Sequence, residues 1–148
     1  MKIDAIVVDI DNTIINTTPI FEEIFTKGLK GSAMWDYFDT NCTRDNLEII
    51  QPIVDLVNLY YDSEYEVIFL SARSNEIAKA TKEMLDKIFD TSVFLITRDK
   101  DDYRPSPDIK RDKLVKLMGD YNIRLFLDDE SSNCQAAKDL GIVALKVF

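Results

Sequence analysis

The sequence contains no histidine among its 148 residues. This absence excludes the Ser-His-Asp and Cys-His systems of nucleophilic catalysis, together with the imidazole ligands of the usual zinc sites. An acid, base or nucleophile therefore has to come mainly from Asp, Glu, Lys, Ser, Thr or Tyr. Acidic residues are plentiful, since 27 residues are Asp or Glu and 18 are Lys or Arg.

Cysteine and long apolar runs are also scarce. Cys42 and Cys134 lack the clustered spacing of a zinc site or a disulfide framework, which favours free, buried thiols. No apolar run is long enough to span a bilayer, and Asp4 and Asp9 interrupt the apolar segment near the N-terminus, unlike a signal peptide. We therefore expect a cytoplasmic protein that does not bind membranes.

Basic residues are in the minority, and the formal net charge is −9. This balance disfavours broad attraction to nucleic acid, because phosphate binding needs a positive surface, but it is compatible with a local basic pocket. The length and the hydrophobic content of 46% fit one globular domain over residues 1–148.

Apolar runs alternate with amphipathic segments along most of the chain, which is typical of an α/β domain with a mainly parallel sheet. The expected strands cover residues 3–8, 66–70, 92–97, 123–127 and 142–148. The expected helices cover residues 52–61, about 77–88, 108–118 and about 132–140. Ser74 or Asn75 can cap the second helix, and Ser132 and Gln135 have the spacing of a capping box. We predict a Rossmann-like parallel sheet flanked by helices.

Residues 16–50 fit this alternation least well. The segment contains many aromatic residues and the pair Gly28 and Gly31. We expect it to form a small cap insertion after the first strand, packed over one end of the sheet. Within it Trp35, Tyr37 and Phe38 are candidates for stacking on a nucleobase, although packing inside the insertion is favoured for at least two of them.

Polar side chains follow three of the expected strands and begin one helix. These residues are Asp9, Asp11, Thr13, Ser71, Arg73, Lys110, Asp128 and Asp129. Because ligands of open α/β sheets bind beyond the carboxyl ends of the strands, the four segments can converge on one crevice. Lys113 is an alternative to Lys110 as the lysine that binds phosphate. We prefer Lys110 because it lies closer to the start of the helix.

This combination of residues suits phosphate chemistry on Mg²⁺. The cation prefers oxygen ligands and binds substrate phosphate, so Asp9 and Asp128 are natural ligands. Aspartate is also a nucleophile in phosphoryl transfer through an aspartyl-phosphate, and a neighbouring carboxyl can protonate the leaving oxygen and later activate water. Asp9 and Asp11 would form such a pair.

Four short motifs resemble those of the haloacid dehalogenase superfamily, in the same order and after the same strands. They are "DIDNT" at residues 9–13, "FLSAR" at 69–73, Lys110 in "PDIKRDKL", and "LFLDDE" at 125–130. An isolated Asp-x-Asp is a weak signal, but the ordered set of four is strong. The resemblance implies a phosphatase.

The resemblance also implies a role for each matching residue. Asp9 would be the nucleophile and a Mg²⁺ ligand; Asp11 would be the general acid and base and a ligand through its backbone carbonyl; Thr13 would orient Asp11. Ser71, with Ala72 and Arg73 beside it, would bind the transferring phosphoryl group, and Lys110 would neutralise charge on it and on Asp9. Asp128, directly or with Asp129 through water, would hold Mg²⁺.

Within the superfamily the sequence is most similar to the 3′-phosphatase domains of bacteriophage polynucleotide kinases. The shared features are Ser-x-Arg in the second motif, an arginine-containing loop with Arg104, and the final Asp-Asp pair. The resemblance implies that Arg104 and Thr13 contribute to substrate binding beside the residues of the second motif. The likeness covers the first strand and residues 51–148, and it implies removal of a 3′-phosphate from a nucleic-acid end, with a separate kinase or ligase as a possible partner.

Three alternatives remain open from the sequence. A phosphatase of free nucleotides fits the same residues, and the acidic net charge leans towards it. A phospho-accepting receiver domain also combines acidic residues, a lysine and a Ser or Thr, but its acidic pair precedes the accepting Asp. A noncatalytic binding domain would have no need of the intact set of nucleophile, acid and lysine.

Overall fold

A five-stranded parallel sheet forms the centre of the molecule. The computed structural model describes all residues 1–148, and its strands have the order β3-β2-β1-β4-β5 with every neighbouring pair parallel. The strands are β1 (Ile3–Val8), β2 (Glu66–Ser74), β3 (Phe94–Arg98), β4 (Tyr121–Asp128) and β5 (Ala144–Lys146). The predicted α/β sheet is confirmed, and two boundaries differ most: β2 extends four residues further, and β5 is much shorter than expected.

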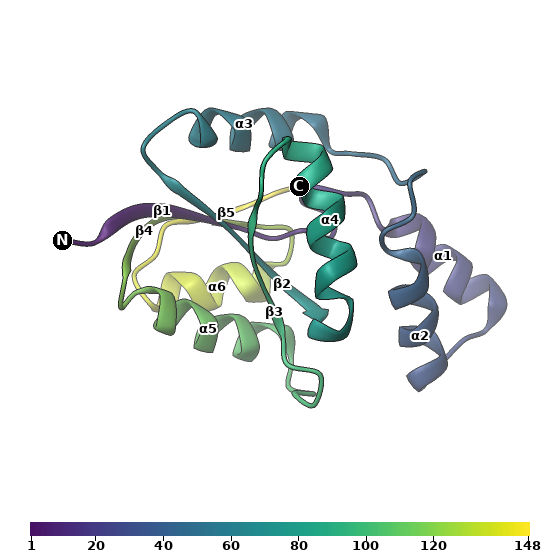
Figure 1. Cartoon of the computed structure of the whole chain (residues 1–148). Coiled ribbons are helices and arrows are strands. Elements are labelled where there is room, and N and C mark those ends of the chain that lie inside the picture. Colours follow the sequence, from purple (N-terminus) through teal and green to yellow (C-terminus); the bar gives the residue numbers. More distant parts are fainter.

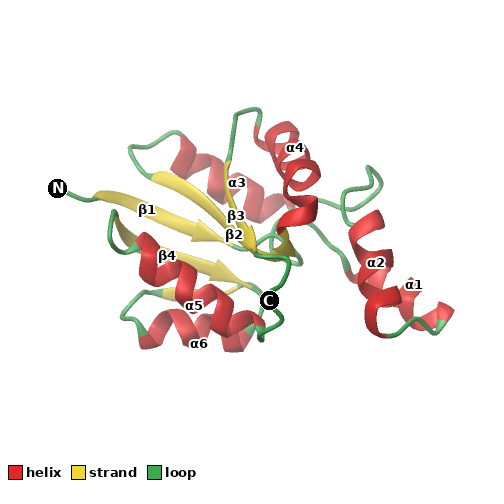
Figure 2. Ribbon diagram, turned by 60° about the horizontal axis from the view of Figure 1, so that its bottom comes forward, coloured by secondary structure: helices red, strands yellow, loops and turns green.

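Helices cover both faces of this sheet (Figures 1 and 2). One face carries α3 (Gln51–Tyr61) and α4 (Ala78–Phe89), and the other carries α5 (Ser106–Leu117) and α6 (Ser131–Asp139). Alternate residues of β1 point into two different cores, so both faces of the strand are apolar. Ile6 and Val8 belong to a core of 19 buried residues under α3 and α4. Ala5 and Val7 belong to a core of 11 buried residues under α5 and α6. None of the helices is both long enough and apolar enough to cross a membrane.

Two helices between β1 and α3 form the insertion that the sequence predicts. They are α1 (Thr18–Lys27) and α2 (Gly31–Asn41), and they lie beyond the carboxyl ends of the strands, at the right of Figures 1 and 2. A single bridge from Ile15 to Ile49 joins the two ends of the insertion, and a second from Ile15 to Asp11 connects them to the loop after β1. The two helices therefore stand over the edge where polar residues follow the strands.

The helix starts lie within two residues of the predictions, the largest difference being at α5, which begins at Ser106 instead of residue 108. Ser74 caps the turn before α4 as expected, because its side chain accepts a hydrogen bond from the Glu76 N–H. The predicted capping box of Ser132 and Gln135 is wrong: α6 begins one residue earlier with Glu130 at the N-cap, which makes no side-chain cap bond. Instead, the carboxylate of Asp128 accepts from the Glu130 N–H at 2.9 Å.

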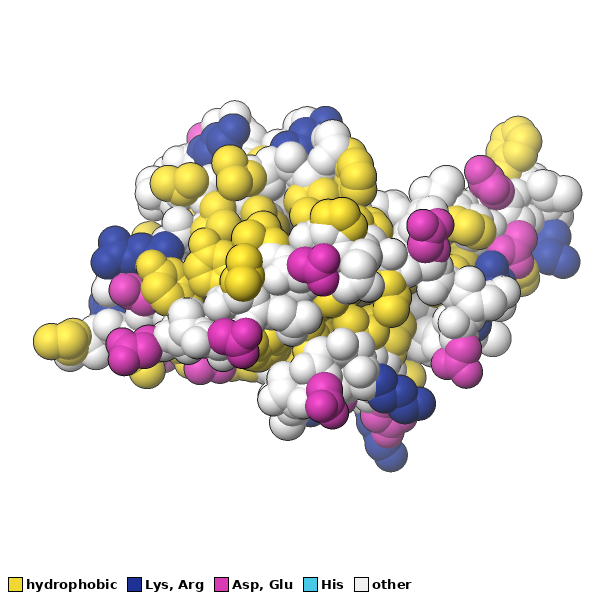
Figure 3. All heavy atoms as spheres, turned by 90° about the horizontal axis from the view of Figure 1, so that it is seen from above, with side chains coloured by type: hydrophobic (Ala, Val, Ile, Leu, Met, Phe, Trp, Pro, Cys, Tyr) yellow, Lys and Arg dark blue, Asp and Glu magenta, His cyan; other side chains and the backbone are white.

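The surface over α3 is mixed in character. In the space-filling view from above, apolar side chains gather over the middle of the molecule, and basic side chains form separate groups towards its margins (Figure 3). The exposed large apolar residues of the molecule include Leu59 of α3 and Leu145 of β5. This face therefore lacks the continuous positive surface that a long nucleic acid requires.

Candidate active site

The candidate site lies where the three central strands end. Because β1 stands between β2 and β4, the residues that follow or end these strands come together at one edge. Asp9 follows β1, Ser71 lies near the end of β2, and Asp128 is the last residue of β4. A cleft of about 550 Å³ opens there between the sheet, the insertion and the loop that connects β3 to α5.

Lys110 occupies the centre of the site. It lies in the second turn of α5, its side chain is buried, and its ammonium group lies 2.7 Å from Oδ1 of Asp9 and 2.6 Å from Oδ2 of Asp128. Lys113, one turn further on, instead lies 3.7 Å from the exposed Asp99. The structure thus places Lys110, and not Lys113, beside the two carboxylates.

Burial and charge shift the pKa values of this group. Burial raises the pKa of Asp9 well above its usual range; the charge of Lys110 opposes this shift, and those of Asp128 and Asp11 add to it. Burial on its own lowers the pKa of Lys110, but the two carboxylates outweigh it and the pKa is raised. One lysine therefore leaves excess negative charge, and a further cation would favour the ionised, nucleophilic form of Asp9.

Three carboxylates could hold such a cation. One oxygen each from Asp9, Asp128 and Asp129 lies within 4.8 Å of the others. Three negative charges facing one lysine leave a net charge of about −2, and all the donors are oxygens, the ligands that Mg²⁺ prefers. The residues therefore fit a divalent cation, as the sequence resemblance implies. Burial raises the pKa of Asp129 as well, which a nearby cation would reverse.

Asn133 belongs to this group, although the sequence analysis missed it. It is buried in the first turn of α6, and its amide nitrogen lies 3.2 Å from both carboxylate oxygens of Asp128. With Lys110 and the Glu130 N–H it fixes the orientation of that carboxylate. The only feature of the sequence that could have pointed to Asn133 is its position, five residues after Asp128 at the start of a predicted helix.

The loop after β1 differs from the prediction at Thr13. The hydroxyl of this buried residue donates to Oδ2 of Asp9 at 3.1 Å, so it orients Asp9 and not Asp11, and it does not line the cleft. Asn12 takes a positive φ of 59°, which asparagine tolerates better than most residues. Its side-chain oxygen accepts from the Thr17 N–H at 3.1 Å and connects the loop to the start of α1.

Arg73 is the residue that holds Asp11. Its guanidinium donates from Nε and Nη2 to the two carboxylate oxygens of Asp11, at 3.0 and 2.7 Å. We expected Arg73 to contact substrate, but the side chain is buried and this two-point contact occupies it. The geometry therefore gives Arg73 a positioning contact with the expected general acid.

Arg73 also contacts the insertion. Nη2 donates to the backbone oxygen of Cys42 at 3.1 Å, and the guanidinium lies 5.8 Å from the centre of the Phe38 ring. Nη1 donates to the hydroxyl of Thr81 in α4 at 3.2 Å. One arginine thus connects the sheet, α4, the insertion and Asp11.

Ser71 and Ala72 lie where the strand leaves its regular pairing. The register of β2 with β3 shifts between Leu70 and Ser74, and the hydroxyl of buried Ser71 accepts from the Arg73 N–H at 3.0 Å. Ala72 lines the cleft, and its backbone oxygen accepts from Nε of Arg98 at 3.0 Å. The hydroxyl of Ser71 donates no hydrogen bond within the protein, but Ser71, like Thr13, does not line the cleft.

The two arginines of the β3–α5 side differ in their partners. Arg104, a predicted substrate contact, lines the cleft but donates to Asp102 and Asp112. Arg98 donates only to backbone oxygens, among them that of Asp102 at 2.9 Å. Of the four cationic side chains that line the cleft, Arg98 is therefore the one without a carboxylate within 4 Å.

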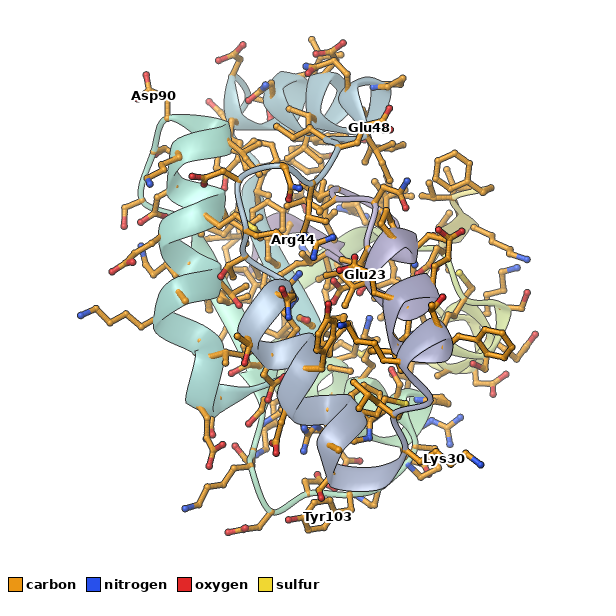
Figure 4. All side chains as sticks on the ribbon, turned by 90° about the vertical axis from the view of Figure 1, so that its right-hand side faces the viewer. Glu23, Lys30, Arg44, Glu48, Asp90 and Tyr103 are labelled. Carbon is orange, nitrogen blue, oxygen red and sulfur yellow. The ribbon has the colours of Figure 1, made fainter.

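The aromatic residues of α2 fall into two groups. Phe38 is buried against Phe21, and the hydroxyl of Tyr37 donates to Glu23 at 2.7 Å, so both hold the insertion together. Glu23 also binds Arg44, as Figure 4 shows. Trp35 lines the cleft and is 53% exposed. Packing therefore explains two of the three candidates, as expected, and leaves Trp35 available.

Comparison with solved structures shows which known fold this is. The fold matches a chain of the Pnkp1/Rnl/Hen1 complex with a TM-score of 0.74 and 22% identity, covering 99% of this chain and 46% of that chain. It matches the class C acid phosphatase from Bacillus anthracis with a TM-score of 0.68 and 21% identity, covering 95% and 62%. It also matches the haloacid dehalogenase-like protein SP0104 from Streptococcus pneumoniae with a TM-score of 0.67 and 14% identity, covering 99% and 85%. This is the fold of the haloacid dehalogenase superfamily.

The family within that superfamily follows from the sequence model that matches the chain. The model of the polynucleotide kinase PNKP phosphatase domain matches residues 3–148, so the chain belongs to this family of phosphatase domains. Comparison with curated proteins found no significant relative. The chain spans less than half the length of the matched chain in the Pnkp1/Rnl/Hen1 complex.

Proposed function

We propose that this domain is a Mg²⁺-dependent phosphomonoesterase that removes 3′-phosphate groups from nucleic-acid ends through an aspartyl-phosphate on Asp9. The observation that carries the proposal is the buried group of Asp9, Asp128 and Lys110 at the carboxyl edge of the sheet. The match to PNKP phosphatase domains supports the choice of substrate.

The first half of the reaction uses Asp9 and Asp11. A carboxylate oxygen of Asp9 attacks the phosphorus, the bond from phosphorus to the 3′-oxygen breaks, and protonated Asp11 gives its proton to that oxygen. Lys110 and the Ser71 hydroxyl stabilise the charge on the transferring oxygens. Thr13, on this proposal, keeps the Asp9 carboxylate in place instead of contacting substrate.

The second half regenerates the enzyme. Asp11, now ionised, takes a proton from water, the water oxygen attacks the phosphorus, and the bond to Asp9 breaks to release inorganic phosphate. Arg73 holds Asp11 in position for both proton transfers. Asp9 and Asp128, with Asp129 directly or through water and the backbone oxygen of Asp11, would hold Mg²⁺, which would supply positive charge that offsets the carboxylates and the phosphate.

Other proteins of nucleic-acid repair are plausible partners on this proposal. The chain resembles a chain of a complex that contains Pnkp1, Rnl and Hen1, and that complex acts in RNA repair. Removal of a 3′-phosphate leaves a hydroxyl, so a kinase for the 5′ end or a ligase would act on the product. We infer that such an enzyme, on a separate chain or in the same assembly, works beside this domain.

The test is phosphate release from DNA and RNA oligonucleotides that carry a 3′-phosphate, compared with the same oligonucleotides carrying a 5′-phosphate and with a 3′-mononucleotide. We expect release from the 3′-phosphorylated oligonucleotides with Mg²⁺, none with EDTA, and none from an Asp9→Asn variant. Activity on the mononucleotide alone would move the function to free nucleotides. A stable phosphoprotein without turnover, or no reaction at all, would favour a receiver or a binding domain.

A further inference from the structure

The cleft carries two exposed aromatic side chains that the proposed chemistry does not use. Trp35 comes from α2 of the insertion, and Tyr103 comes from the loop between β3 and α5. Their exposed fractions are 53% and 85%. In Figure 4 Tyr103 lies by the N-terminal end of α2, in agreement with the fact that Ser32 and Tyr103 both line the cleft.

Trp35 is supported from behind and is continuous with the candidate site. Its ring packs edge-on against Phe38 with the ring centres 6.1 Å apart, and Phe38 in turn lies beneath the guanidinium that holds Asp11. An aromatic wall therefore runs from the mouth of the cleft to the expected general acid. A flat group bound against Trp35 would therefore share the cleft with the reacting phosphate, because Asp9, Asp11 and Trp35 all line it.

The charges of the cleft disfavour recognition through a phosphate backbone. Seven carboxylates and four cationic side chains line it, and three of the four cations are paired with carboxylates. A track of phosphates needs free basic residues, whereas stacking of a base on an aromatic ring does not. The volume of about 550 Å³ is that of a small-molecule pocket, which fits the end of a strand better than a long stretch of it.

We propose that Trp35 and Tyr103 bind the nucleobase of the terminal nucleotide, so that this domain selects unpaired nucleic-acid ends that bear a base next to the 3′-phosphate. The inference rests on the proposed function and adds to it the group that is recognised. It applies equally to DNA and RNA, because both present the same aromatic faces. A base held in a helical stack would be less available to the two rings.

The first experiment uses the fluorescence of Trp35, the only tryptophan in the sequence. The Asp9→Asn protein is titrated with a 3′-phosphorylated single-stranded oligonucleotide, and with one whose terminal nucleotide lacks the base. We expect saturable quenching by the first and much weaker quenching by the second. Unchanged fluorescence, while the polarisation of a dye-labelled oligonucleotide shows full binding, would overturn the proposal.

The second experiment measures kcat and KM for Trp35→Ala and Tyr103→Ala. For single-stranded DNA and RNA with a 3′-phosphate we expect kcat/KM to fall about 5- to 150-fold, mostly through KM. Hydrolysis of the baseless oligonucleotide and of p-nitrophenyl phosphate should not change, and Trp35→Phe should restore most of the loss. Phe25→Ala is the matched control, because Phe25 is an exposed aromatic residue of the insertion that does not line the cleft.

The outcomes separate this inference from the proposed function. If the wild-type protein cleaves 3′-phosphates and both alanine variants have the same kcat/KM, the inference is overturned and the proposed function stands. Equal losses on substrates with and without a base would also overturn it, because they indicate a structural role. A wild-type protein that hydrolyses p-nitrophenyl phosphate but no 3′-phosphorylated end would overturn both.

Discussion

Lys110 is a single ammonium group between two buried carboxylates. It lies 2.7 Å from Asp9 and 2.6 Å from Asp128. Such a charge-assisted contact orients the expected nucleophile and offsets charge that would otherwise repel a phosphate. Lys113 has the same side chain on the same helix but pairs with the exposed Asp99, so the two lysines form a matched pair for mutation.

We predict that Lys110→Met lowers kcat on a 3′-phosphorylated oligonucleotide by at least about 100-fold, whereas Lys113→Met stays within about twofold of wild type. Lys110→Met should also unfold at a lower urea concentration, because it leaves two buried carboxylates without their cation. Steady-state kinetics and urea denaturation check both expectations. A larger loss at Lys113 would contradict the assignment.

Asp11 gives a prediction about the leaving group. Asp11→Asn cannot donate a proton, so it should slow release from a 3′-phosphate by about 10²- to 10⁴-fold. The loss should be much smaller with p-nitrophenyl phosphate, because nitrophenolate leaves without a proton. Asp36→Asn, which changes another carboxylate that lines the cleft, should have little effect on either substrate. Equal losses of Asp11→Asn on both substrates would argue against an acid role.

The two thiols should be inert in the folded protein. Burial raises the pKa of Cys42 to about 11, and burial likewise raises the pKa of Cys134. At pH 8 only about one Cys42 in a thousand would be thiolate, the form that reacts. We expect Ellman's reagent to label neither cysteine quickly in the native state and both after denaturation. Rapid labelling of one thiol in the native protein would show that its region opens.

At the scale of elements, the insertion is held by a cluster of charges and rings. Arg44 donates from Nη1 to Glu23 at 2.9 Å, and Tyr37 donates to the same carboxylate. Hydrogen bonds from Arg44 and Tyr37 lower the pKa of Glu23 to about 2. Because the folded-state pKa lies below the ordinary value, the contribution to stability is complete above about pH 4.5 and disappears as the pH falls towards 2.

The lowered pKa of Glu23 predicts that the stability of the insertion depends on pH. Glu23→Gln should unfold at a lower temperature than wild type between pH 5 and 7. The difference should shrink below about pH 4 and vanish near pH 2, since the wild-type carboxyl is then protonated too. Thermal unfolding of both proteins across this range is the measurement. A difference that does not depend on pH would show that the charge on Glu23 contributes nothing.

Most elements could be predicted from the sequence, and the errors have local causes. Apolar runs such as that of β1 are covered on both faces, so their pattern identifies a strand without fixing its ends. The capping box failed because Asp128, a residue of the previous strand, satisfies the Glu130 N–H at the start of α6. That contact depends on how the site is folded, so the residues around the start of α6 could not predict it.

At the scale of the molecule, strand order explains why residues so far apart in sequence meet. The motifs predicted the participants because parallel strands end at one edge, and the structure brings Asp9, Lys110 and Asp128 together there. The partners of Thr13 and Arg73 could not be predicted in this way. They depend on side-chain directions in a packed interior, which motif spacing does not specify.

The arrangement of acids predicts that the whole molecule responds to Mg²⁺. Asp9, Asp128 and Asp129 repel one another around a single lysine, so a bound cation should raise the midpoint of thermal unfolding. Asp128→Asn should lose this response, whereas Asp120→Asn, an exposed residue just before β4 and so at the opposite end of that strand from Asp128, should keep it. Scanning calorimetry with Mg²⁺ or EDTA checks the expectation, and an equal response in both variants would contradict the proposed ligands.

The most direct test of the account is to identify the residue that accepts the phosphoryl group. The protein is mixed with Mg²⁺ and a 3′-phosphorylated oligonucleotide, quenched in acid, and treated with borohydride, which reduces an aspartyl-phosphate to homoserine that tandem mass spectrometry can locate. The account predicts homoserine at position 9 alone, and none with the 5′-phosphorylated oligonucleotide. Homoserine at another aspartate, or equal labelling from both oligonucleotides, would contradict it.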